Sequence, residues 1–215
     1  MPSEQIENYL KNIYKIESAE GKVSTSSLSE RLQISPASVT EMVKKLASEG
    51  SLTHTPYKGV SLTEAGKRAA LKILRKHRLW EMFLVEVLHF SWDEIHEEAE
   101  KFEHIMSDKM EEKIDEVLGF PEVDPHGDPI PNRNGIVKRV RWLALANVEE
   151  GSTVRVVRVN DANPELLQYA SSVGLSLNRK IMVKQRMKFD NSLIVRIGSK
   201  ELTISATLAK NIFVE

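Results

Sequence analysis

The chain has 215 residues, of which 41% are hydrophobic and 28% charged, and its formal net charge is −1. This length and composition predict a globular protein of two or three small domains, and no apolar run approaches the roughly 18 residues that a membrane span requires. The sequence contains no cysteine, which excludes disulfides, zinc–thiolate sites, iron–sulfur clusters and thiol nucleophiles, so nitrogen and oxygen atoms must bind any metal ion.

The first part of the chain predicts a winged helix-turn-helix. Residues 4–17 carry apolar side chains at helical spacing and no secretion signal precedes them, so we expect a first helix and a cytoplasmic protein. Two shorter helices follow, joined by a turn at residues 34–36 in which Ser35 is the expected N-cap. Two short strands, at 51–54 and 59–62, then flank a second turn. This order of helix, turn, helix and hairpin is typical of a DNA-binding module.

The second helix of this motif has the two faces that a recognition helix needs. Val39, Met42, Val43 and Leu46 are expected to pack inward. Small hydroxyl and methyl groups on the other face can read DNA shape and thymine methyls, while lysines contact phosphates. The residues expected to face DNA are Ser35, Ala37, Ser38, Thr40, Glu41, Lys44, Lys45 and, at the hairpin tip, Lys58. Residues 1–68 carry 9 basic against 8 acidic side chains, so a monomer would bind DNA weakly and dimerisation would help. A winged helix that binds proteins is the alternative.

The remainder of the chain predicts a helical part and a β-rich part. Apolar periodicity indicates one long helix at 64–87 and a second at 93–118. The second helix lies in a strongly acidic segment, with 13 acidic against 3 basic residues at 93–124. Residues 120–135 are rich in proline, glycine and asparagine and read as a linker. The last 70 or so residues contain short β-branched segments around one short helix, which indicates a small β-barrel-like module.

The two long helices carry residues suited to metal binding. On a continuous helix at 93–118, four such side chains would share one face. The helix at 64–87 offers two more, which lie four residues apart. The residues concerned are His96, Glu100, Glu103 and His104 on the second helix, and His77 and Glu81 on the first. Imidazole and carboxylate without thiolate suit manganese or iron, and more weakly zinc or cobalt. A solvated acidic helix face is the alternative.

Several segments resemble one known family, the diphtheria toxin repressor family of metal-dependent transcriptional regulators, and the resemblance covers the whole chain. They are ENYLKNIY, ISPASVTEMVKKLASEG, RKHRLWEMFL, EEAEKFEHIMSD and PHGDPIP. The resemblance implies a mainly α fold with a small β part and a homodimer that binds double-stranded operator DNA, with no membrane and no organic cofactor. The implied domains are a winged helix at 1–65, a helical dimerisation and metal-binding domain at 66–132, a linker at 133–147 and an SH3-like, FeoA-like domain at 148–215.

The resemblance also implies two metal sites. The first would use Asn8, Glu100, Glu103 and His104. The second would use His77, Glu81 and His96, completed by Glu165 and Gln168 from the C-terminal module. Asp124 and His126 resemble alternative second-site ligands of manganese-responsive relatives.

Two departures from the family pattern bear on which metal is bound. Iron-type members carry cysteine at the position of Glu100 and methionine at that of Asn8, so the oxygen donors here favour manganese. Manganese-type members usually carry aspartate at the Asn8 position and a second carboxylate at that of Lys11. Without them the chain cannot copy the two-metal first site of the short manganese-binding members, and we expect the second metal at the His77 site.

These features together predict a metal-activated repressor of metal-uptake genes rather than an enzyme. Metal would tie the first helix, through Asn8, to the dimerisation helix and so set the spacing of the recognition helices. The expected metal is Mn²⁺, with Fe²⁺ as the alternative and Zn²⁺ or Co²⁺ as substitutes in vitro. A metal-dependent hydrolase is a distant alternative, since the chain has no HExxH motif, nucleophile triad or phosphate loop. A regulator that senses an organic ligand is a third hypothesis.

Overall fold

A computed structural model describes residues 3–55, 59–138 and 140–215, and the chain forms two compact units. The first unit comprises Met1–Leu79, Glu100–Lys113 and Ile130–Val137, and the second comprises Trp80–Ala99, Ile114–Pro129 and Lys138–Glu215. Three helices, α4, α5 and α6, contribute residues to both units. Among the described residues, no helix is both long enough and apolar enough to cross a membrane.

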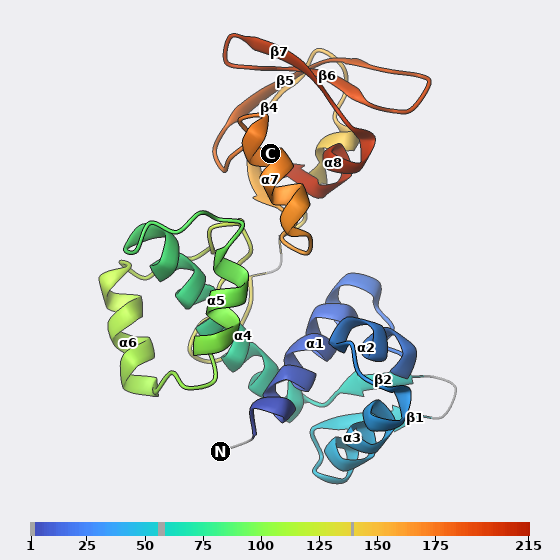
Figure 1. Ribbon diagram of the computed structural model, residues 1–215, viewed down its shortest axis with the longest axis vertical. Coiled ribbons are helices and arrows are strands. Elements are labelled where there is room, and N and C mark those ends of the chain that lie inside the picture. The colour runs from blue at the N-terminus through green and yellow to red at the C-terminus, as the bar shows by residue number, and fades with distance from the viewer. Residues whose placement is uncertain (1–2, 56–58, 139) are drawn as a thin grey trace. The chain divides into compact units, whose positions relative to one another are not determined.

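The first unit contains the predicted winged helix (Figure 1). Its elements are α1 (Glu4–Glu20), α2 (Thr25–Leu32), α3 (Pro36–Ser48), β1 (Leu52–Thr55) and β2 (Gly59–Leu62). The helix α3 begins where the sequence predicts, because Ser35 Oγ accepts a hydrogen bond from the backbone N–H of Ser38 at 3.2 Å and proline occupies the first helical position. The strands β1 and β2 pair antiparallel, with Leu52 opposite Leu62.

The core of this unit orients α3. Val39, Val43 and Leu46 are fully buried against Leu10 and Ile13 of α1, and Met42 is partly buried beside them. Burying a valine or leucine side chain contributes about 1.5–3 kcal/mol, so these residues fix which face of α3 packs inward. The opposite face is left to solvent.

The single helix predicted at 93–118 is wrong, because the chain forms two helices there, α5 (Ile95–Phe102) and α6 (Asp108–Val117). Ser107 begins α6, since its hydroxyl accepts a hydrogen bond from the N–H of Met110 at 3.2 Å. In addition, Lys76 of α4 (Glu64–Glu86) donates to the backbone oxygen of Met106 at 2.5 Å. A side chain far away in sequence therefore binds a carbonyl that would otherwise accept within a helix.

The C-terminal part of the second unit is an antiparallel sheet with the strand order β3-β8-β4-β5-β6-β7, which curls round on itself in Figure 1. Its elements are β3 (Leu143–Ala144), the 3₁₀ turn η1 (Leu145–Asn147), β4 (Thr153–Val159), α7 (Pro164–Ser172), β5 (Lys180–Arg186), β6 (Leu193–Ile197), β7 (Lys200–Ile204), α8 (Ala206–Asn211) and β8 (Ile212–Val214). The strand β3 pairs with β8, so part of the segment expected as a linker belongs to this sheet. The predicted fold class, mainly α with a small β-barrel, is confirmed.

Candidate metal centre

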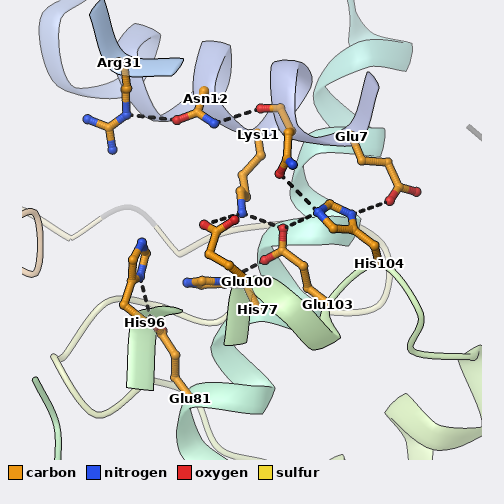
Figure 2. Close-up of polar contacts among 11 residues, drawn as sticks. Glu7, Lys11, Asn12, Arg31, His77, Glu81, His96, Glu100, Glu103 and His104 are labelled. Atoms are coloured by element: carbon orange, nitrogen blue, oxygen red, sulfur yellow. Dashed lines mark hydrogen bonds and ion pairs between the residues drawn. The ribbon is translucent and has the colours of Figure 1, made fainter. Parts of the chain in front are cut away.

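In the first unit, residues of α1, α4 and the end of α5 form a buried polar cluster (Figure 2). Glu100, Glu103 and His104 each offer one donor atom, and these atoms lie within 4.8 Å of one another. His104 Nε2 is 3.1 Å from Asn8 Oδ1 and 3.2 Å from Glu103 Oε1. The structure therefore brings the four predicted residues of the first site together. It does so at the end of α5 and in the turn after it, since Glu103 and His104 follow the last residue of the helix.

The carboxylates of this cluster are held in place by buried cationic and imidazole groups. Glu103 is completely buried, and its two oxygens contact Lys11 Nζ at 2.5 Å and His77 Nδ1 at 2.6 Å. Lys11 Nζ also lies 2.7 Å from Glu100 Oε1. Burial alone would raise the pKa of Glu100, but Lys11 and His77 lower it to about 2. At neutral pH Glu100 is therefore an ionised oxygen donor.

Glu7 belongs to this cluster although the sequence did not single it out. Its Oε2 lies 2.7 Å from His104 Nδ1, on the side of the ring opposite Nε2. Metal-binding histidines usually donate their second ring N–H to a carboxylate or carbonyl, which fixes the tautomer and the ring orientation. Glu7 is in position to orient His104 so that Nε2 faces Asn8 and Glu103. The sequence feature that points to Glu7 is its position directly before Asn8, a predicted ligand in α1.

The second unit contains another group of donors. Glu81, His96 and Asp161 offer donor atoms within 4.8 Å of one another, and His96 Nδ1 is 3.1 Å from Glu81 Oε1. Asp161, in the loop before α7, was not predicted. Glu165 and Gln168 expose their side chains on α7, and Glu165 is not part of this group. Both stay predictions, and so does His77 as a second-site ligand; its Nδ1 lies 2.6 Å from Glu103 Oε2 in the first unit.

His126, also in the second unit, is fully buried, and among the described residues neither of its ring nitrogens has a hydrogen-bond partner. Burial lowers the pKa of its imidazole, while the charges of Glu81 and Asp161 act in the opposite direction. Buried polar groups are nearly always hydrogen-bonded, so a buried ring whose nitrogens have no such partner among the described residues is suited to bind an ion. A neutral imidazole is also a common metal ligand.

The loop that carries His126 is built to hold it. Asp124 Oδ1 accepts hydrogen bonds from the backbone N–H groups of His126 and Asp128, both at 2.9 Å. Gly127 has φ +91°, and a Cβ there would lie 2.1 Å from the backbone oxygen of Val157, so only glycine fits. Because Asp124 Oδ1 accepts both of these hydrogen bonds, it holds the loop in its conformation. That Asp124 also binds a metal ion stays a prediction.

The predicted DNA-facing residues lie along the solvent side of α3 and its N-cap. Thr40 is half-buried and its hydroxyl donates to the backbone oxygen of Pro36 at 2.8 Å. The others are exposed, namely Ser35, Ala37, Ser38, Glu41, Lys44 and Lys45. The hydroxyl of Ser35 also caps the helix. Lys58 lies outside the described residues.

Both donor sets fit a divalent metal ion of the manganese and iron type. They consist of carboxylate, amide and imidazole groups without sulfur, which are the donors that such ions prefer. The buried His126, whose ring nitrogens have no hydrogen-bond partner within the described part of the chain, supports the assignment of a metal site. Together with the exposed face of α3, these groups define a class of protein in which a winged helix is coupled to metal binding.

Comparison with known proteins identifies the family. Residues 1–60 match the model of the iron-dependent repressor N-terminal DNA-binding domain, residues 63–132 that of its metal-binding and dimerisation domain, and residues 143–215 the FeoA domain. The chain belongs to the iron-dependent repressor family, a family of metal-dependent transcriptional repressors and not of enzymes.

Individual relatives are similar to this protein over most of its length. The iron-dependent repressor IdeR of Mycobacterium leprae is 29% identical over 222 residues, which covers 97% of this chain and 96% of that protein. The diphtheria toxin repressor of Corynebacterium glutamicum is 35% identical over 187 residues, or 81% of each chain. A solved manganese-dependent transcriptional repressor in complex with manganese is 40% identical, with a TM-score of 0.89, and the match covers 97% of this chain and 98% of that one.

Proposed function

We propose that the protein is a cytoplasmic, metal-activated repressor that binds operator DNA and controls metal-ion uptake, with Mn²⁺ as the activating ion. The observation that carries this proposal is the position of Asn8. It lies on α1 of the winged helix, and its Oδ1 is 3.1 Å from His104 Nε2 in the turn after α5. A ligand set that includes Asn8 joins the DNA-binding helices to the metal-binding residues.

The first site consists of Asn8, Glu100, Glu103 and His104, and the second of Glu81, His96, Asp161 and His126. A divalent ion would supply two positive charges around which the donor atoms of each site converge. In the first site Asn8 would then hold α1 against the turn that contains His104, and Glu7 would keep the imidazole oriented. Metal activates DNA binding only to the extent that it binds this conformation of the protein more tightly than the conformations that do not bind DNA.

The donor atoms favour manganese over iron. Glu100 contributes an ionised carboxylate and Asn8 an amide oxygen, and both are hard ligands. The 40% identical solved repressor is described as manganese-dependent, which agrees with this preference. Fe²⁺ is the alternative, because IdeR of M. leprae is described as iron-dependent.

The protein is proposed to act as a homodimer. The dimerisation domain of the family covers residues 63–132. In the second unit the residues directly after α4 expose three large apolar side chains, Val87, Leu88 and Phe90. Apolar side chains that gather on a surface mark an interaction site. Two recognition helices in one dimer would compensate for the nearly balanced charge of the winged helix.

The proposal is tested by fluorescence anisotropy on duplex DNA from the upstream region of the protein's own gene. The protein is titrated in chelator, in Mn²⁺ and in anaerobic Fe²⁺. We expect Mn²⁺ to tighten binding by about 10- to 100-fold over chelator, and Fe²⁺ to act more weakly. Equal binding with and without metal contradicts metal activation, and a stronger effect of Fe²⁺ contradicts the assignment of manganese.

A further inference from the structure

Lys11 is a buried ammonium group among the proposed metal ligands. Its side chain is 1% exposed, and its Nζ lies 2.7 Å from Glu100 Oε1 and 2.5 Å from Glu103 Oε1 (Figure 2). Lysine is almost never fully buried unless it is paired. Here the two carboxylates that pair with it are the same two that the first metal site requires.

The ammonium group and a metal ion would compete for one oxygen atom. Glu103 Oε1 contacts Lys11 Nζ and also lies 3.2 Å from His104 Nε2, the proposed ligand nitrogen. An ion bound between His104 and Glu103 would therefore lie close to Lys11 Nζ. Like charges that approach within a few ångström in a buried site repel strongly, because the effective dielectric constant there is low. Both cations cannot hold Glu100 and Glu103 at once.

We propose that Lys11 is a tethered cation that occupies the first metal site of the metal-free protein and must leave Glu100 and Glu103 before metal binds there. This inference rests on the proposed function and adds a regulatory role for a residue that is not a ligand. Lys11 holds the carboxylates of Glu100 and Glu103 close together without metal, so these donor atoms are already assembled. It also weakens metal binding, and so sets the concentration at which the repressor responds.

The test compares wild-type full-length protein with Lys11→Met, which keeps the length of the side chain and removes its charge. For the titration alone, the two are compared in an Asp161→Asn background, with Lys11 intact or replaced, so that the second site does not dominate the heat signal. Calorimetric titration with Mn²⁺ should show first-site binding at least about tenfold tighter in Lys11→Met. The melting temperature of the metal-free variant should be lower than that of wild type, and its rise on adding Mn²⁺ should be larger.

Lys15→Met is the matched control. Lys15 lies one turn further along α1, and its charge also lowers the pKa of Glu100. This variant should change Mn²⁺ affinity by no more than about twofold, as expected for a half-buried charge that solvent still screens. If Lys11→Met binds Mn²⁺ no more tightly than wild type, Lys11 stays with the carboxylates in the metal-bound protein and the inference is wrong. If wild type itself binds no metal, the proposed function fails instead.

A second measurement does not depend on the stability of the variant. In wild-type protein with isotope-labelled lysine, the side-chain amino signal of a buried, hydrogen-bonded Lys11 should be visible by NMR in chelator. We expect Zn²⁺, a diamagnetic substitute, to abolish or shift this signal at one equivalent per first site. A signal that is unchanged at saturating Zn²⁺ would rule out displacement.

Discussion

Replacing Glu103 with glutamine should abolish metal-dependent DNA binding. Glu103 is completely buried, and its oxygens contact Lys11, His77 and His104. Glutamine keeps the shape of the side chain but removes its charge, so the first site loses its central anionic ligand. We expect Mn²⁺ affinity at this site to fall by about 100-fold or more, since even the loss of residues that only support ligands costs 10- to 100-fold. Calorimetry and anisotropy on operator DNA measure the two effects.

Glu112→Gln is the matched control for this substitution. It removes the same charge from an exposed side chain on α6 that pairs with Arg133 at 3.2 Å. An exposed pair of this kind contributes at most about 1 kcal/mol, so metal and DNA binding should be unchanged. The metal-free Glu103→Gln protein should also lose about 3 kcal/mol of unfolding free energy, because a buried ion pair is broken on one side. Metal-dependent DNA binding that survives in Glu103→Gln would show that this cluster is not the activating site.

The sequence predicts the winged helix well because its signals are local. Ser35 caps α3, Pro36 fits the first helical position, and the apolar spacing from Val39 to Leu46 matches the buried face. None of these features depends on residues far away in the chain. The same argument covers the β-branched strands of the C-terminal sheet.

The break between α5 and α6 was missed because its cause is not local. The carbonyl of Met106 is bound by Lys76, 30 residues earlier, and periodicity alone cannot predict such a contact. The segment from Ile95 to Val117 keeps apolar residues at helical spacing on both sides of the break. The helical-face argument for Glu103 and His104 therefore rested on a continuous helix that does not exist. Their grouping with Glu100 follows from the turn instead.

The sequence does not predict the roles of Asp161 and Lys11, for a different reason. Asp161 is a single aspartate in a loop, without a helical or strand pattern to give its direction. Lys11 was interpreted only as a missing carboxylate, whereas the structure buries its Nζ between Glu100 and Glu103. A sequence read one element at a time cannot show that a cation of one helix pairs with anions about 90 residues later. Such pairings become visible only when the elements are packed.

His126→Leu should have opposite effects on the metal-free and the metal-bound protein. In the metal-free protein, His126 buries two ring nitrogens without hydrogen-bond partners among the described residues, and such burial costs about 1–3 kcal/mol. Leucine removes this cost, so the melting temperature in chelator should rise by about 2–12 °C. The further rise that Mn²⁺ produces should shrink, because the second site loses a ligand. Differential scanning calorimetry in chelator and in Mn²⁺ measures both, and His54→Leu, on an exposed strand position, is the control.

The pH dependence of stability in the metal-free protein shows whether His126→Leu acts by removing a buried neutral imidazole or only by repacking the core. Burial lowers the pKa of His126 below its usual value of 6.5, so below about pH 6.5 the unfolded chain binds a proton that the folded chain does not. The folded protein therefore loses stability through His126 as the pH falls below about 6.5, and no such loss occurs above that pH. In His126→Leu this loss should disappear, which makes the stabilising effect of leucine larger at pH 5.5 than at pH 7.5. An effect of the same size at both values would mean that the imidazole is not held neutral by burial, and that its ring nitrogens have partners in solution.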